Sequence, residues 1–242
     1  MSDALLNDDA SRAQIAAPVN RSAEEWRMRQ LAKAELRARF PRARIVEEFP
    51  VRYSTNRIDL AAIQPDGIVG VEIKSSRDTL DRLEAQLRAF EPICGRLIVA
   101  LAPSFNQKLP MKPVEFRRGG KYYAGAAPQF TPAQQIVNRL GGRVETWTVD
   151  ADQGVVEGEV HGNWTTPHSR RLLDVLHVSE LVAIANRRRL PQARRPVHAT
   201  LAQTCFDLLT GREIIADACA ALRARDAFAA GSDDPVLSGE AP

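Results

Sequence analysis

The sequence predicts an α/β fold in which a mixed sheet is flanked by helices and is followed by a C-terminal helical module. Strand patterns and helical patterns alternate between residues 22 and 150, in the order α-β-β-β-α-β-α-β. The strand pattern at 96–101 is a continuous apolar run, which is typical of buried parallel strands. From about Ser169 onward the periodicity is entirely helical.

Local signals place the helices of the first part. Ser22 and Glu25 have the spacing of a capping box, which predicts a helix from there to about Phe40. A leucine stripe predicts a second helix over 78–90. The Thr-Pro pair at 131–132 predicts the start of a third helix, with threonine as the cap and proline in the first turn.

Short strand patterns lie between these helices. The Gln-Pro-Asp-Gly segment at 64–67 has turn chemistry, because proline presets φ and glycine accepts positive φ. It predicts a hairpin between the two strands around it. Strands are expected at 45–49, 57–60, 70–74, 96–101 and 143–149.

Two carboxylates and a lysine are expected on one face of this hairpin. Alternate side chains of a strand point the same way, so Glu72 and Lys74 share a face. A turn at 64–67 places Asp59 opposite Glu72. Like charges that oppose each other across a sheet destabilise it. A bound cation removes that cost, and oxygen ligands suit Mg²⁺.

The preceding hairpin extends the row of carboxylates. A turn at 53–56 places Glu48 opposite Asp59, so that one acidic row would cross three strands. The assignment depends on register, because a slip of one residue would exchange Glu48 for Glu47. Glu25 could approach from the first helix, but its capping role explains it, and it is left out of the expected site.

At these residues the chain resembles the PD-(D/E)XK nuclease superfamily. The pattern is Asp59, twelve further residues, and then Glu72-Ile73-Lys74. The closest resemblance is to a branch of bacterial and phage proteins whose core reads RxDIA…EIKSxxDTLxRLxxQ. This chain departs from the branch at Val71 and Phe90, where aromatic and tyrosine residues are usual. The resemblance covers 22–102 well, and 131–149 and 170–225 more loosely.

The resemblance implies a restriction-endonuclease-like fold for 22–150 and a metal-dependent nuclease activity, with Mg²⁺ as cofactor and Mn²⁺ as a substitute. It implies that Asp59, Glu72 and the carbonyl of Ile73 hold the metal ion, with Glu48 as a further ligand. Lys74 would orient the attacking water or stabilise the developing charge. Gln86 would support the site from the helix that follows.

Basic residues supply candidates for nucleic-acid contact. Interleaved basic and aromatic residues can hold phosphates and stack on bases, and arginine clusters match phosphate oxygens. For both groups a solvated surface is the alternative. The candidates are Arg117, Arg118 and Lys121 in one group, and Arg187, Arg188, Arg189, Arg194 and Arg195 in the other.

The chain divides into four expected segments. We expect a mobile leader at 1–21, the first domain at 22–150, the helical module at 151–225 and a disordered tail at 226–242. Residues 103–130 lack periodicity and are expected as a long loop inserted in the first domain. Loops of this length are usually functional or disordered.

Composition narrows the class of protein. The 242 residues carry a net charge of only +3, which does not by itself indicate nucleic acid. No apolar run approaches the roughly 20 residues of a membrane span, and no basic segment precedes an apolar one at the N-terminus. The three cysteines lack paired spacing and are expected as reduced, buried thiols in the cytoplasm. The sequence contains no Walker-type phosphate loop, so no nucleotide cofactor is expected.

The expected function is therefore that of a Mg²⁺-dependent deoxyribonuclease related to DNA repair or to phage. DNA is the expected partner, and no membrane partner is expected. Two alternatives stay open. One is a nucleic-acid-binding module that keeps the nuclease fold with weak or no cleavage. The other is an interaction protein of a phage or mobile-element assembly. A second copy of the chain or a partner protein is compatible with all three.

Overall fold

The computed structural model describes residues 22–51, 56–107, 109–141, 143–158, 165–226 and 228. The expected leader at 1–21, most of the expected turn at 53–56 and nearly all of the expected tail after 226 lie outside these residues.

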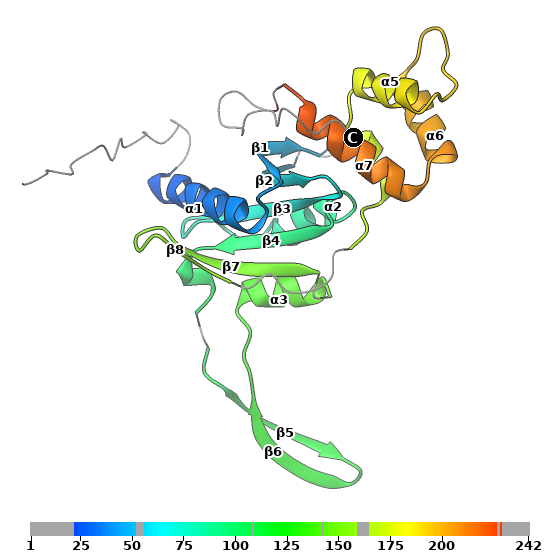
Figure 1. Cartoon of the computed structure of the whole chain (residues 1–242). Helices are drawn as coiled ribbons and strands as arrows, with labels where there is room; N and C mark the ends of the chain where they lie inside the picture. Colours follow the sequence, from blue (N-terminus) through cyan, green and yellow to red (C-terminus); the bar gives the residue numbers. More distant parts are fainter. Residues whose placement is uncertain are drawn as a thin grey trace, which may run out of the picture.

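A six-stranded mixed sheet forms the centre of the protein (Figure 1). A mixed sheet was predicted, but with five strands, and the sixth strand, at 155–157, lies in the segment that was expected to be the helical module. Its spatial order is β1-β2-β3-β4-β7-β8. The first three strands are antiparallel, β3, β4 and β7 are parallel, and β8 returns antiparallel to β7. The strands are β1 (Arg44–Pro50), β2 (Arg57–Gln64), β3 (Gly67–Lys74), β4 (Arg96–Leu101), β7 (Val144–Asp150) and β8 (Val155–Glu157).

Helices cover both faces of this sheet, and each face has its own apolar core. Helix α1 packs on one face through Met28, Ala32 and Leu36. Helices α2 and α3 and the C-terminal helices pack on the other. The helices are α1 (Ala23–Arg39), α2 (Leu83–Phe90), α3 (Pro132–Arg139), α4 (Ser169–Asp174), α5 (Val178–Arg187), α6 (His198–Leu208) and α7 (Gly211–Ala224).

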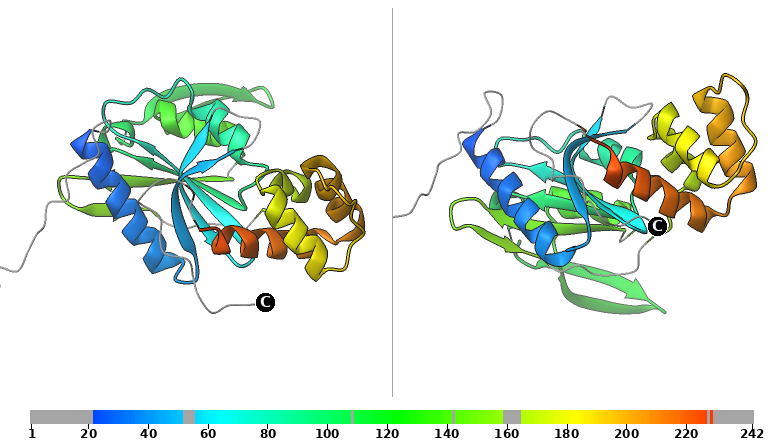
Figure 2. Two further views of the ribbon diagram at one scale, coloured as in Figure 1. Left: turned by 90° about the horizontal axis from the view of Figure 1, so that it is seen from above. Right: turned by 45° about the horizontal axis from the view of Figure 1, so that its top comes forward.

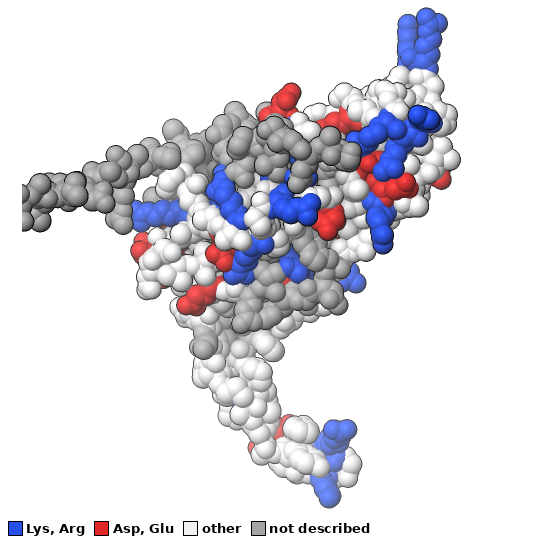
Figure 3. Space-filling model, in the orientation of Figure 1, with Lys and Arg blue, Asp and Glu red and all other residues white. Residues whose placement is uncertain are grey.

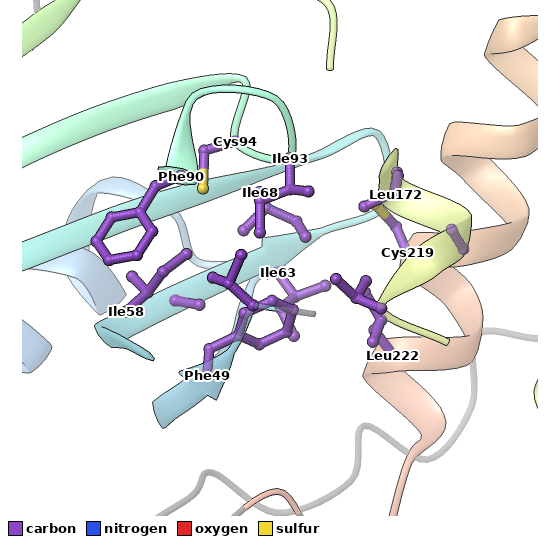
Figure 4. Close-up of a cluster of buried hydrophobic side chains, with 14 of the residues drawn as sticks. Phe49, Ile58, Ile63, Ile68, Phe90, Ile93, Cys94, Leu172, Cys219 and Leu222 are labelled. Atoms are coloured by element: carbon purple, nitrogen blue, oxygen red, sulfur yellow. The ribbon is translucent and has the colours of Figure 1, made fainter. Parts of the chain in front are cut away.

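The C-terminal helices share the core of the sheet. Leu172 of α4 and Leu222 of α7 lie in the same buried cluster as Phe49 and Ile63 of the sheet (Figure 4). Figures 1 and 2 show α5 and α6 on the far side of the molecule from the start of α1. The predicted helical module is therefore present, and its apolar surface is continuous with that of the sheet.

The predicted local signals act as expected where strands and helices begin. The Ser22 hydroxyl accepts a hydrogen bond from the Glu25 amide at 3.1 Å at the start of α1, as predicted. The Glu25 carboxylate, to which the sequence analysis gave only a capping role, lies 3.3 Å from Arg29. Gln64 pairs with Gly67, which closes the tight turn between β2 and β3. Thr131 caps α3 in a capping box with Gln134.

The second helix is shorter than predicted. It begins at Leu83, whereas the leucine stripe predicted a start near Asp78. The Asp78 carboxylate accepts hydrogen bonds from the amide and the hydroxyl of Ser75, each at 2.7 Å. Short polar side chains that bond to nearby backbone in this way compete with helix formation. The segment therefore turns before the helix starts.

The stretch 103–130 is not the loop that the missing periodicity predicted. A 3₁₀ turn (Pro103–Phe105) leads to a separate two-stranded hairpin of β5 (Lys112–Arg118) and β6 (Lys121–Ala127). Gly119 and Gly120 connect the strands with φ of +58° and +76°, as a two-residue hairpin turn requires. The hairpin projects away from the sheet (Figure 1). We refer to residues 112–127 as the arm.

Two further expectations concern the cysteines and membrane-spanning segments. The three cysteines, Cys94, Cys205 and Cys219, are buried free thiols, as predicted. Within the described residues, no helix combines the length and apolarity needed to cross a membrane.

Candidate active site

The structure brings together three of the predicted site residues, Glu72, Lys74 and Gln86. Glu72 and Lys74 lie two apart on β3 and point to the face that α2 covers. The Lys74 ammonium donates to Glu72 Oε1 at 2.9 Å and to Gln86 Oε1 at 3.1 Å. The Gln86 amide nitrogen donates to the same Glu72 oxygen at 2.6 Å. The three side chains therefore form a closed hydrogen-bonded triad.

Asp59 lies next to this triad, at the end of the β2–β3 pairing. The last paired residues are Leu60 and Val71, so one further step in register places Asp59 opposite Glu72, as predicted. There the Asp59 carboxylate accepts the Ile73 amide at 2.8 Å. A side chain has taken the place of the backbone of β2 as the partner of this amide.

Glu72 is an unusual carboxyl group. It is only 3% exposed, and its Oε2 atom has no hydrogen-bond partner among the described residues. Burial, and then the charge of Asp59, raise the pKa of Glu72 to about 8, against smaller opposing effects of Lys74 and Gln86. A divalent cation next to Oε2 and Asp59 would satisfy this oxygen and favour the charged form. The residues present therefore fit the expected ion.

Arg29 of α1 belongs to the site, although the sequence analysis did not select it. It is 1% exposed. Its guanidinium donates to Asp59 Oδ1 at 2.9 Å and to the Asp59 carbonyl at 2.7 Å. It also lies 3.3 Å from Glu25 and 3.5 Å from Glu48.

Neighbouring carboxylates stabilise the positive charge of Arg29. Burial lowers the pKa of Arg29, but the charges of Asp59, Glu48 and Glu47 outweigh this effect, so the pKa is raised. The sequence signal that could have identified Arg29 was its position on α1, within the buried stripe that includes Met28 and Ala32. A cation on an apolar stripe requires a buried anion.

Glu48 was chosen over Glu47 as a site residue because successive side chains of a strand point to opposite faces. The backbone at Glu48 interrupts this alternation. Glu48 lies between the pairs Glu47–Leu60 and Phe49–Ile58 and is therefore opposite Asp59, as predicted. Its φ is +52°, a region that non-glycine residues adopt rarely. Both glutamates reach α1 as a result. Glu47 is buried against Lys33 at 3.0 Å, and Glu48 contacts Arg29.

The metal ligands remain a prediction. Within the described ranges, no group of three histidine, cysteine, aspartate or glutamate side chains is arranged to hold an ion. Asp59 and Glu72 are the pair that interact most directly, through the charge effect on Glu72. Ile73 contributes its amide to Asp59, whereas its carbonyl is the predicted ligand. Glu48 joins the cluster through Arg29.

The two predicted groups of nucleic-acid-binding residues occupy separate surfaces (Figure 3). Arg117, Arg118 and Lys121 are exposed at the tip of the arm. The second group lies where α5 meets the connection to α6, and the structure divides it. Two of its members bind acidic residues of α7 and three are exposed: Arg187 and Arg188 lie 2.8 Å from Asp217, and Arg189, Arg194 and Arg195 face solvent.

Part of the chain is similar to a known protein family. Residues 29–112 match the family described as bacteriophage P4 protein cII. This range includes Arg29, Asp59, the Glu72–Lys74–Gln86 triad and the first residue of the arm, but less than half of the chain. No curated protein and no solved structure gives a significant match.

Proposed function

We propose that the protein is a Mg²⁺-dependent nuclease that hydrolyses DNA phosphodiester bonds at the Asp59–Glu72–Lys74 cluster. The observation that carries the proposal is the buried Glu72 Oε2 atom, which lacks a hydrogen-bond partner among the described residues beside a second carboxylate. Buried polar atoms are nearly always satisfied. An exception next to another acid and a lysine is typical of a catalytic site.

The roles follow from the contacts. Asp59 and Glu72 would hold the ion, which when bound would polarise a phosphoryl oxygen and lower the pKa of an attacking water. Lys74, fixed by Glu72 and Gln86, is placed to stabilise negative charge that develops on the phosphate. Gln86 fixes both of its partners through one amide group, so its contribution is to position them. Hydrolysis would then join the water oxygen to phosphorus as the ester bond breaks.

Cleavage assays with single-residue variants test this function. Glu72→Gln and Lys74→Ala should abolish Mg²⁺-dependent cleavage of DNA while the circular dichroism spectrum stays that of the wild type. Glu157→Gln makes the same chemical change at an exposed position of β8 and should cleave like the wild type. Wild-type cleavage rates in Glu72→Gln would refute the assignment.

A second candidate function is nucleic-acid binding without cleavage, and the contacts of Asp59 favour it. Its Oδ1 accepts from Arg29 and its Oδ2 from the Ile73 amide, so both oxygens already have partners. A guanidinium in this position supplies the positive charge that a metal ion would otherwise supply. The match with the bacteriophage P4 protein cII family is compatible with this candidate and with a role in a phage assembly.

Calorimetric titration separates the candidates. The nuclease should bind Mn²⁺ with heat that is lost in Glu72→Gln, whereas a binding module whose site is filled by Arg29 should show no such heat. Cleavage assays on duplex, nicked, branched and single-stranded DNA would then identify the substrate.

A further inference from the structure

The arm is a two-stranded ribbon with both faces open to solvent. Nearly every residue of β5 and β6 is exposed, and the two strands form a sheet of their own, separate from the central one. Seven residues per strand correspond to a length of about 24 Å. An exposed ribbon of this length adds nothing to the apolar core, so its shape depends on its own strand pairing and turn.

Basic side chains occupy both faces at the tip of the arm. Register pairs Arg118 with Lys121 and Arg117 with Tyr122. Directly opposed residues point to the same face, so Arg118 and Lys121 lie on one face and Arg117 lies on the other. The only acidic residue of the arm, Glu115, lies two residues from Arg117 on the same face and accepts a hydrogen bond from the Tyr122 hydroxyl. The blue tip is visible in Figure 3.

The opposed pair Arg118–Lys121 points to an anionic partner. Like charges directly across a hairpin destabilise it, and within residues 112–127 no acidic residue shares the face of this pair. A phosphate backbone would offset it. The same ribbon carries exposed aromatic rings behind the tip, with Phe116 stacked on Tyr123 at 5.3 Å and both rings about half exposed. These rings would contact the sugars and bases that lie between phosphate rows.

The root of the arm lies at the edge of the sheet that carries the candidate site. Lys74 at the end of β3 pairs with Leu101 at the end of β4, and the Lys74 carbonyl accepts the Ala102 amide at 2.9 Å. The chain then enters the 3₁₀ turn that leads to the arm. The root of the arm is therefore close to Glu72 and Lys74, whereas its basic tip projects away from the sheet (Figure 1).

We propose that the arm is a clamp that enters a groove of double-stranded DNA. The clamp would make duplex DNA the substrate of the proposed nuclease, and this inference rests on that proposed function. Cations on both faces of a ribbon match a groove, which has a phosphate row on each side. A single strand would need cations along one face only. The major groove of B-DNA admits a two-stranded ribbon.

The test is DNA binding in EDTA, where the proposed nuclease cannot cleave. Fluorescence anisotropy would be measured with a labelled duplex and with the corresponding single strand, at several salt concentrations. The variant Arg117→Ala/Arg118→Ala/Lys121→Ala removes the tip charges. Arg42→Ala/Arg212→Ala removes exposed arginines elsewhere and serves as the control.

We expect the tip variant to bind the duplex at least about 10-fold more weakly and to lower the slope of log K against log[salt] by about 2–3, because each phosphate contact contributes about 0.9. The control should retain wild-type affinity, and Arg117→Lys/Arg118→Lys should retain the slope. Wild-type affinity in the tip variant, or no duplex binding by the wild type, would overturn the proposal. An equal or larger loss with the single strand would overturn the assignment to duplex DNA. Loss of cleavage in Glu72→Gln tests the nuclease separately, because that variant should still bind.

Discussion

At the residue scale, the two oxygens of Glu72 have different surroundings. Oε1 accepts from both Lys74 and Gln86, whereas Oε2 is buried without a hydrogen-bond partner among the described residues. Burial removes water from both oxygens of a charged carboxylate here, and only Oε1 gains hydrogen bonds in its place. Protonation or a bound cation relieves this cost, and the two compete. Metal binding should therefore release a proton from Glu72 and strengthen as the pH rises.

The metal-free protein should lose stability as the pH rises. In the unfolded chain Glu72 releases its proton near its ordinary value of 4.5, whereas in the folded chain it holds the proton to about 8. Between these values the folded state binds more protons, so the free energy of unfolding falls with increasing pH. Glu72→Gln cannot ionise. It should flatten this fall and raise stability above pH 8 by about 0.5–2 kcal/mol. Urea unfolding in EDTA measures both effects, and an unchanged pH dependence in Glu72→Gln would contradict the account.

Substitution of the two neighbouring glutamates should have different consequences. Glu48→Ala should weaken Mn²⁺ binding or cleavage, because Glu48 faces Asp59 at the site. Glu47→Ala should leave metal binding nearly unchanged, but it removes the partner of buried Lys33 and should cost about 3 kcal/mol of stability. Calorimetry and thermal unfolding separate the two readouts. Loss of metal binding in Glu47→Ala alone would show that Glu47, and not Glu48, serves the metal site.

At the element scale, the parts of the fold that follow from hydrophobic periodicity were predictable. The six-residue run of β4 and the hairpin around the turn at 64–67 formed as expected. The same strand periodicity placed Glu72 and Lys74 together, and the helix after them brought Gln86 to both. These predictions depend on the two-residue period of strands and on turn chemistry, which are local properties.

Other elements could not be read from periodicity. The arm has no buried face, so its strands show no alternation of apolar and polar residues. Its Gly-Gly turn was the available signal. The start of α2 depended on the hydrogen bonds between Asp78 and Ser75. The role of Arg29 depended on Asp59, which lies thirty residues away in the chain, and sequence alone does not show such a pairing.

Packing of Cys94 and of Leu97 in β4 against β3 leaves room for no more than a glycine at position 70. A Cβ atom there would lie 2.8 Å from Cys94 Sγ and 3.1 Å from Leu97 Cδ2. Gly70→Ala should therefore destabilise the protein by about 1–3 kcal/mol through overpacking. Gly125→Ala is the matched control, because a Cβ in that strand meets no atom within 4 Å. Thermal unfolding measures both. Adding Cys94→Ala to Gly70→Ala should recover part of the loss, and a double variant no more stable than Gly70→Ala would argue against this contact.

At the scale of the whole molecule, the two basic surfaces are far apart, with the tip of the arm at the bottom of Figure 1 and the connection between α5 and α6 at the upper right. The arm leaves from the edge that carries Lys74. Helix α7 packs near the other edge, where Cys219 contacts the Gly67 backbone in the β2–β3 turn. The exposed arginines after α5 lie beyond that helix (Figure 1). DNA held at both surfaces would pass along the molecule, and each surface would add its own phosphate contacts.

The arginines after α5 should contribute to binding only where they are exposed. Arg188 bonds Asp217 and lies 3.2 Å from Glu213, so its charge is already paired within the protein. Arg189→Ala/Arg194→Ala/Arg195→Ala should therefore weaken duplex binding and reduce the salt slope by up to about 2.7, because three phosphate contacts at most are lost. Arg188→Ala should instead lower the melting temperature and leave the slope nearly unchanged. Mn²⁺ affinity should be that of the wild type in both variants, since Asp59 and Glu72 lie at the other edge of the sheet. A salt slope that is unchanged in the triple variant would show that these arginines are a solvated helix end.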